Sequence, residues 1–347
     1  MTMLTILAFF IVFGVVVFFH EMGHFIVAKL AGIKVYEFSL GFGPRLFSFK
    51  KDGTIYGINA FPLGGLVRVA GLDEIQQEKA KPAERYENKS WSVRAGVLFA
   101  GPFMNLVLAF LIFVFLFSVM GVPQKSSSQI MSVYPGSPAS LAGWQAGDTI
   151  EYFNGKKVTE MDKVITAIHK AKESELSFII LHQGQRYIYQ IKPEYYPKQD
   201  ISLLGISLKP LSYKRYNPGE AILKGLLQTF WITKEIFIGF FRLFAERASF
   251  TDIAGPIGIA KLSGEAAAQG WLVFLQFIAI LSINLGILNI LPIPALDGGR
   301  LLFLYLEKIF GKKISIEKER FIHYLGFSFL IILFILITLQ DLKKIFE

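Results

Sequence analysis

The segment of the chain that most directly indicates chemistry is the pentapeptide His20-Glu21-Met22-Gly23-His24. Residues four apart on an α-helix share one face, so the two imidazoles can bind the same metal ion. Zn²⁺ suits neutral imidazole nitrogen and needs no redox partner. Glu21 follows the first histidine, where its carboxylate can accept a proton from a water on the metal and return it to a leaving amine. The pattern predicts His20 and His24 as zinc ligands and Glu21 as the catalytic base.

A catalytic zinc site needs a third protein ligand, and Asp297 is the best candidate. It lies in the segment 289–299, Asn-Ile-Leu-Pro-Ile-Pro-Ala-Leu-Asp-Gly-Gly, where two prolines break a helix and two glycines let the backbone turn closely. Irregular backbone at membrane depth is tolerated only where it lines a protein cavity. The alternative is that Asp297 caps the helix that begins at Gly298. The remaining histidines are poorer candidates because of their positions in the chain: His169, His182 and His323.

The elements that must position these residues are membrane helices. Of 347 residues, 53% are hydrophobic and 18% charged, the mean hydropathy is +0.47, and there is no cysteine. Soluble proteins have about 25% charged residues. The composition excludes a disordered chain and a disulfide-rich secreted protein, and it leaves no thiolates for a structural zinc finger. The net charge of +9 is spread between long apolar runs, so we expect no nucleic-acid partner.

Four apolar segments are long enough to cross a lipid bilayer. We expect transmembrane helices at residues 1–31, 95–121, 271–297 and 321–340. The His-Glu-x-x-His motif then lies at the end of an apolar helix, where ionisable groups are costly and usually functional. Residues 221–245 are also apolar but include four charged side chains, which favours an amphipathic helix on the membrane surface, with a fifth span as the alternative. The charges are Lys224, Lys234, Glu235 and Arg242.

The distribution of Lys and Arg predicts the orientation in the membrane. These residues are concentrated between the first and second predicted spans and again after the third, which places both segments in the cytoplasm. The basic C-terminus conflicts with this arrangement, and we give more weight to the loops because their charges are more numerous. We therefore expect both termini and the polar segment 123–210 outside the cytoplasm, and the active site within the membrane near its cytoplasmic side.

The polar segment 123–210 has the pattern of a small α+β domain. It contains Ser-Pro-Ala at 137–139, Ala-Gly at 142–143, Gly-Asp-Thr-Ile at 147–150 and Asn-Gly at 154–155. This series resembles the PDZ domains of bacterial proteases. PDZ domains bind an extended peptide by strand addition at a sheet edge, so the resemblance implies that a peptide or substrate segment binds here. The alternative is a small β-rich domain without a ligand.

The two motifs of the predicted spans together resemble the site-2 protease family of intramembrane zinc metalloproteases. Four spans and a PDZ insertion make the chain similar to the bacterial branch that includes the regulator of sigma-E protease. Gly-Phe-Gly-Pro at 41–44 and Gly-Pro-Phe-Met-Asn at 101–105 agree with it, so the resemblance covers nearly the whole chain. One departure is that the polar segment has room for a single PDZ domain, whereas the best-known members carry two.

The resemblance implies a site and a location. Zn²⁺ is held by His20, His24 and Asp297, with Glu21 as the base and with Asn289 and Asn284 lining the substrate cleft. The location is a bacterial cytoplasmic (inner) membrane, with several passes. We interpret Asn105 as structural, holding the second span against its neighbours through its amide.

Residues 34–71 alternate as short strands separated by Gly-Pro, Asp-Gly and Leu-Gly-Gly turns. A protease must hold its substrate extended, and a hairpin directly after the catalytic helix offers a sheet edge for this purpose. The family has a membrane-associated β-sheet at this place that pairs with the substrate strand. Gly64 and Gly65 are accordingly candidate substrate-binding residues. The alternative is a cytoplasmic hairpin that only packs.

The sequence therefore predicts a polytopic α-helical membrane protein with four transmembrane helices, a membrane-associated β-sheet and one inserted α+β PDZ domain. The expected activity is hydrolysis of peptide bonds in transmembrane segments of membrane proteins. This is regulated intramembrane proteolysis, for example of an anti-sigma factor or a signal-peptide remnant. One alternative is a non-catalytic, membrane-anchored PDZ scaffold. Another is a metal transporter, which would need a second set of ionisable groups that the predicted spans lack.

Overall fold

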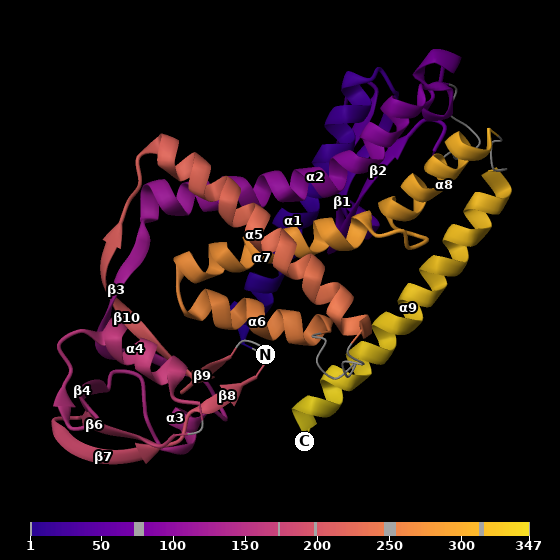
Figure 1. Cartoon of the computed structure of the whole chain (residues 1–347). Coiled ribbons are helices and arrows are strands. Elements are labelled where there is room, and N and C mark those ends of the chain that lie inside the picture. Colours follow the sequence, from indigo (N-terminus) through magenta and orange to yellow (C-terminus); the bar gives the residue numbers. More distant parts are fainter. Residues whose placement is uncertain are drawn as a thin grey trace. The chain divides into compact units, whose positions relative to one another are not determined.

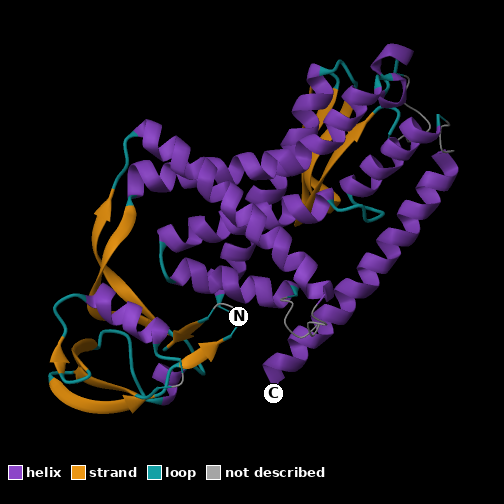
Figure 2. Ribbon diagram, viewed as in Figure 1, coloured by secondary structure: helices purple, strands orange, loops and turns teal. Residues whose placement is uncertain are grey.

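The computed structural model describes residues 2–72, 80–172, 174–197, 200–245, 255–311 and 316–346. The chain divides into two compact units. The helical unit comprises Met1–Phe115 and Pro218–Glu347, and the β-rich unit comprises Leu116–Asn217. The first consists of packed helices with a small sheet, and the second of twisted strands with short helices (Figures 1 and 2).

Four helices of the structure are long and apolar enough to cross a bilayer: Met3–Leu30, Trp91–Met120, Trp271–Ile290 and Glu317–Lys343. They confirm the predicted class of helical membrane protein. The helices of the helical unit are α1 (Met3–Leu30), α2 (Trp91–Phe115), α5 (Pro218–Ala245), α6 (Pro256–Ala268), α7 (Trp271–Ile290), α8 (Asp297–Phe310) and α9 (Ile316–Phe346). Two short 3₁₀ turns, Pro82–Glu84 and Tyr86–Asn88, precede α2, and a π-helical turn, Leu116–Met120, follows it.

Helix α7 ends at Ile290, earlier than the expected limit at residue 297. The cause is Pro292, because the residue before a proline is pushed out of the helical region. Leu291 is accordingly extended, with φ −63° and ψ 144°. The chain then forms an irregular loop, residues 291–296, before α8 begins at Asp297.

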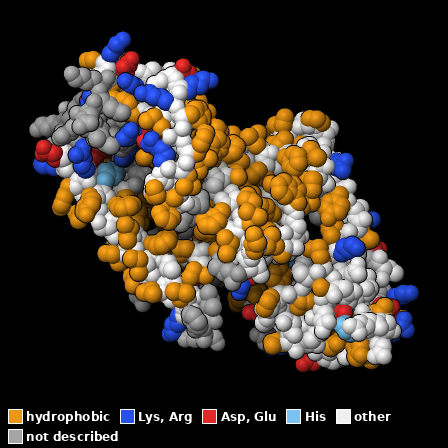
Figure 3. Space-filling view, turned by 180° about the vertical axis from the view of Figure 1, so that it is seen from behind, with side chains coloured by type: hydrophobic (Ala, Val, Ile, Leu, Met, Phe, Trp, Pro, Cys, Tyr) orange, Lys and Arg blue, Asp and Glu red, His pale blue; other side chains and the backbone are white. Residues whose placement is uncertain are grey.

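The transmembrane core of the helical unit forms where α1 packs between α2, α6 and α7. Val12 and Val16 of α1 are almost fully buried, and they cluster with Leu108 of α2 and with Phe274 and Ile278 of α7. On the outside of the same unit, hydrophobic side chains cover a broad surface, while Lys and Arg gather at one end (Figure 3). An apolar exterior of this extent is suited to contact with lipid rather than water.

Helix α5 is not among the four helices apolar enough to span the bilayer. One face of it packs closely on α2: Ala221 is fully buried, and a Cβ placed on Gly225 would lie 2.7 Å from Val114 Cγ2. The opposite face exposes large apolar side chains, among them Phe230 and Trp231. The predicted position of α5 on the membrane surface stays a prediction.

A two-stranded sheet follows α1, with β1 at Val35–Lys51 and β2 at Thr54–Val69. The sequence predicts four short strands here, whereas the structure joins them into two long, bulged ones. Phe38 of β1 is opposite both Val67 and Tyr56, so residues 35–40 lie between two parts of β2. Among the residues that the structure describes, this leaves the last part of β2, residues 64–69, at an edge of the sheet.

A buried ion cluster ties this sheet together. Glu37 of β1 is 6% exposed, and its carboxylate lies 2.8 Å from Arg45 Nη2 and 3.5 Å from Arg68 Nη2. Two guanidinium groups supply the charge that a buried carboxylate needs. Because Arg68 belongs to the edge part of β2, the cluster also fixes that edge relative to β1.

The β-rich unit contains one large sheet in the order β10-β3-β4-β6-β7, with β5 added on β4 and a separate β8–β9 pair. Its core includes Ile130, Ile150, Phe178 and Ile180. The elements are β3 (Val122–Val133), α3 (Pro138–Leu141), β4 (Thr149–Phe153), β5 (Lys156–Lys157), α4 (Met161–Lys170), β6 (Leu176–His182), β7 (Gln185–Ile191), β8 (Glu194–Tyr196), β9 (Ile201–Leu203) and β10 (Ile206–Lys214).

The PDZ-type motifs occupy the turns of this unit. Ser137 caps α3 by accepting a hydrogen bond from the Ser140 N–H, and Asp148 accepts one from the Gln145 N–H. Asn154 and Gly155 form a left-handed turn with φ 46° and 76°. The motifs thus build the connections of a PDZ-like β domain.

Candidate active site

The structure brings His20, His24 and Asp297 together although they come from two distant parts of the chain. Asp297 Oδ2 lies 3.2 Å from Nε2 of each histidine, and the two Nε2 atoms are 3.3 Å apart. The side chains are 10%, 12% and 18% exposed, so the cluster is nearly enclosed. Helix α1 supplies the two imidazoles from one face, as the four-residue spacing predicts.

These three atoms fit a tetrahedral zinc site. Zinc bonds of about 2.0–2.2 Å place neighbouring tetrahedral ligands about 3.3–3.6 Å apart, close to the observed separations. His24 Nδ1 lies 2.7 Å from the Val97 carbonyl oxygen and must therefore donate its proton there. Nε2 is then the nitrogen left to bind a metal, and it faces the Asp297 carboxylate, so a divalent cation between them would be held by both groups. The donor set of two imidazoles and one carboxylate is that of a catalytic zinc site.

Helix α2 forms the wall behind the two imidazoles. A Cβ placed on Gly101 would lie 2.2 Å from His24 Nε2 and 2.8 Å from His20 Cε1, so only glycine fits here. In α1, a Cβ on Gly23, the residue before His24, would lie 2.2 Å from the Ala100 carbonyl oxygen of α2. The two helices thus meet backbone to backbone at the metal cluster. The sequence does not predict these roles of Gly101, Gly23 and the Val97 carbonyl. It indicates only that a glycine occurs in the segment 20–24 and another in the segment 101–105.

Asp297, the predicted third ligand, is held in place by the packing of α8. Asp297 is the first residue of this helix, and Gly298 and Gly299 lie against backbone carbonyls of the preceding loop, at distances where a Cβ would not fit. At the other end of α8, Glu307 makes two hydrogen bonds of 3.1 and 3.2 Å with Arg94 of α2. Helix α2 therefore fixes both the histidine side and the aspartate side of the site.

A cleft of about 570 Å³ opens onto the metal cluster. Glu21, Asn289 and the edge residues Gly64 and Gly65 all line it. A Cβ on Gly65 would lie 2.4 Å from Glu21 Cγ, so the edge of the sheet passes directly beside the carboxylate. Asn289 Nδ2 lies 3.5 Å from His20 Nε2, next to the metal cluster. The structure thus brings these predicted residues into one cavity.

Two predicted asparagines are placed differently. Asn284 is half-buried on α7 and is not among the residues that line the cleft. Asn105 is fully buried, but its side-chain amide makes no hydrogen bond within the part of the chain that the structure describes. Its backbone carbonyl accepts a hydrogen bond of 2.9 Å from the Ser282 hydroxyl instead. The link between α2 and α7 therefore uses the main chain of Asn105 and not the amide.

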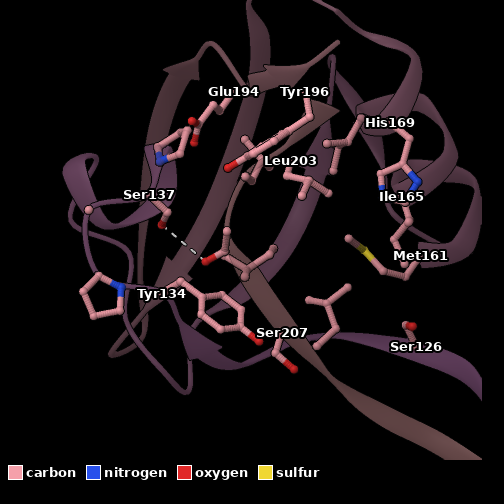
Figure 4. A pocket seen from close by; sticks show the side chains of 18 residues that line it. Ser126, Tyr134, Ser137, Met161, Ile165, His169, Glu194, Tyr196, Leu203 and Ser207 are labelled. Carbon is pink, nitrogen blue, oxygen red and sulfur yellow. Dashed lines mark hydrogen bonds between the residues drawn. The ribbon is translucent and has the colours of Figure 1, made fainter. Parts of the chain in front are cut away.

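The PDZ-like domain has a cavity of its own, about 580 Å³ in volume. Met161 and Ile165 of α4 lie on one side and Ser207 of β10 on another (Figure 4). Several of the residues that line it are apolar, including Leu204, Ile206 and Leu208. Strand β10 is at the edge of its sheet among the described strands, so the groove combines apolar side chains with an accessible strand.

Comparisons with known proteins agree with the geometry. The model of peptidase family M50 matches residues 8–333. Regulator of sigma-W protease RasP of Bacillus subtilis is 32% identical, with 99% of each chain covered. Zinc metalloprotease RasP of Geobacillus kaustophilus is 31% identical, also with 99% of each chain covered.

Among solved structures, the PDZ domain of an SdrC-like protein of Listeria monocytogenes is 24% identical and covers 24% of this chain and 90% of its own, with a TM-score of 0.22. At that score the likeness adds nothing to the PDZ-like assignment, which rests on the motifs and turns described above. The family match, in contrast, spans every element that builds the metal cluster. The chain therefore belongs to peptidase family M50 and is a multi-pass membrane zinc metalloprotease.

Proposed function

We propose that the enzyme hydrolyses peptide bonds within transmembrane segments of other membrane proteins. The observation that carries this proposal is the position of the metal cluster: its histidines belong to α1, one of the four apolar spans, and Asp297 begins α8 seven residues after the end of α7, another of those spans. The cleft at the cluster is bordered by a sheet edge. A substrate helix hides its carbonyls inside its own backbone, so it must unwind before hydrolysis. The edge of β2 at residues 64–69 offers main-chain partners for the unwound segment.

In this proposal His20, His24 and Asp297 hold the zinc ion. When bound, zinc acts as a Lewis acid that polarises the scissile carbonyl and makes water more acidic. Glu21 takes a proton from the attacking water and delivers it to the leaving amine. Asn289 donates an amide hydrogen bond to the negative charge that develops on the carbonyl oxygen. Gly65 lets the sheet edge pass close to Glu21, because a Cβ there would clash with the Glu21 side chain. Gly64 lines the same cleft, and we assign both glycines to the main-chain contact with the substrate.

The test is Glu21→Gln, which keeps the size of the side chain but removes the base. Purified wild-type and variant proteins are compared for zinc content and for cleavage of a tagged single-span substrate in proteoliposomes. We expect the variant to retain zinc and to lose cleavage by at least about 10²-fold, the lower end of the contribution of a general base. Cleavage by the variant at the wild-type rate would refute the assignment. The family membership already removes the scaffold alternative for the chain as a whole.

We further propose that the PDZ-like domain binds an extended peptide or substrate segment along β10. The apolar groove between β10 and α4 and the unpaired edge of β10 among the described strands support this proposal. Leu208→Glu would place a charge in the groove and should weaken peptide binding. Binding of a library of peptides to the full chain, measured by fluorescence anisotropy, checks this; equal binding by the variant would contradict it.

The orientation follows from charge. We propose that the segments rich in Lys and Arg, between α1 and α2 and after α8, face the cytoplasm of a bacterial cell, and that the PDZ-like domain lies outside it. Lys89, Arg94 and Lys308 border one cavity at this end of the helical unit. Labelling of single cysteines introduced into β7 and into the β1–β2 turn, from either side of intact cells, tests the assignment. Labelling of both sites from the same side would contradict it.

A further inference from the structure

The last span contacts the loop that leads to the third metal ligand. Ala295, two residues before Asp297, has φ +83°, a left-handed conformation that is strained for a residue with a Cβ. Its N–H donates a hydrogen bond of 2.8 Å to Nδ1 of His323 on α9. In Figure 1, α9 runs past the turn between α7 and α8, where this contact is made.

His323 makes this contact in its neutral form. Because the Ala295 amide is the donor, Nδ1 must carry the lone pair, which leaves the proton on Nε2. Nε2 lies 3.9 Å from a carboxylate oxygen of Glu319, one turn earlier on α9. The imidazole is 14% exposed and packs edge-on against Phe303 of α8, with 5.5 Å between ring centroids. Its orientation is thus fixed on three sides.

A second contact supports the same loop. Gly326 lies three residues after His323 and therefore on the same face of α9. A Cβ placed on it would lie 2.5 Å from Pro294 Cβ and 2.6 Å from the Pro294 carbonyl oxygen. The backbone of α9 therefore touches the loop directly. The two prolines of the loop have no N–H, so the loop has few backbone donors. The imidazole of His323 accepts a hydrogen bond from one of these donors, the Ala295 N–H.

We infer that His323 is a positioning residue for the metal site: by holding the Ala295 N–H, it keeps Asp297 aimed at His20 and His24. Ala295 and Leu296 line the same cleft as Asp297, so His323 acts from behind the cavity wall. Partners that orient a metal ligand change metal affinity by about 10- to 100-fold when they are removed. The inference rests on the proposed role of Asp297 as a zinc ligand.

The test compares His323→Leu with His323→Asn in the full chain purified in detergent. Leucine removes the acceptor, whereas the Oδ1 atom of asparagine restores one near the place of Nδ1. Zinc affinity is measured by competition with a chelator, and kcat and KM are measured on a tagged single-span substrate. We expect His323→Leu to bind zinc at least about tenfold more weakly and to lose kcat rather than KM, with His323→Asn recovering most of the affinity. Tyr324→Leu, at a neighbouring side chain that is 68% exposed, is the control and should leave both unchanged.

Two results would overturn the inference. One is zinc affinity of His323→Leu within twofold of the wild type; the other is equal impairment of the Leu and Asn variants, which indicates packing alone. If His323→Leu does not fold, Gly326→Ala provides the same test, because its methyl group must push Pro294 away; unchanged zinc affinity there also overturns it. Asp297→Ala separates the two proposals. If it retains zinc, the proposed ligand set fails; if it loses zinc while His323→Leu does not, only this inference fails.

Discussion

The glycine of α2 that faces the imidazoles gives the sharpest mutational prediction. In Gly101→Ala, the new methyl group would lie 2.2 Å from His24 Nε2, whereas unbonded heavy atoms normally stay about 3.5 Å apart. The imidazole or α2 must therefore shift by about 1 Å. A displacement of about 1 Å in a catalytic constellation costs about 10²-fold in rate. We expect Gly101→Ala to lose at least about 10²-fold in kcat/KM and to bind zinc more weakly.

The same helix offers a matched control. A Cβ on Gly96 would meet only Val27 Cγ1, at 4.0 Å, so Gly96→Ala changes the same residue type without entering the site. Replacing glycine by alanine inside a helix stabilises it by about 1 kcal/mol, so neither variant should suffer from loss of helix. Both proteins are purified, their thermal unfolding and zinc content are measured, and cleavage of a single-span substrate is followed in proteoliposomes. Wild-type zinc affinity and turnover in Gly101→Ala would refute the proposed packing of α2 on the metal ligands.

Three further predictions concern the cleft, the metal and the contact between α2 and α8. Gly65→Ala places a Cβ 2.4 Å from Glu21 Cγ, so turnover should fall about tenfold or more while zinc is retained; loss of zinc instead would mean that the sheet edge supports the ligands and not the base. Zinc affinity should weaken as the pH is lowered, because protons compete with the metal for the imidazole nitrogens, and a zinc titration at several pH values checks this; an affinity that does not depend on pH would contradict imidazole ligands. Arg94→Met removes both hydrogen bonds to Glu307, which is mostly buried, and should lower the free energy of unfolding by about 1–3 kcal/mol; an unchanged melting temperature would show that α8 is held by other contacts.

The periodicity of a helix makes the closeness of the two imidazoles predictable from the sequence. His20 and His24 share a face because a helix repeats every 3.6 residues, and this holds wherever the helix packs. The end of α7 was predicted less well: the prolines indicate a break, but only the structure shows that the helix stops at Ile290 and that α8 begins at Asp297. The end of a helix at a proline is a local property of the chain. The path of the loop 291–296, in contrast, involves a contact with His323 of α9, 28 residues after Ala295.

The features of the site that the sequence does not predict are contacts between segments distant in the chain. The fit of Gly101 against two imidazoles and the bond from the Ala295 N–H to His323 join residues that no local pattern relates. His323 is a poor ligand candidate on sequence grounds, and in the structure it contacts the ligand loop rather than the ligand cluster. The β1–β2 sheet is a similar case, because its alternation predicts strands but not that residues 35–40 pair on both sides.

We propose above that the protease cuts its substrates inside the membrane, with zinc held by His20, His24 and Asp297 and with Glu21 as the base. The most direct measurement is mass spectrometry of the products of one single-span substrate, cleaved by the purified protein in proteoliposomes, with Glu21→Gln as the matched control. We predict new termini within the transmembrane segment for the wild type and no products for the zinc-retaining variant. Termini only outside the transmembrane segment, or the same products from Glu21→Gln, would contradict it.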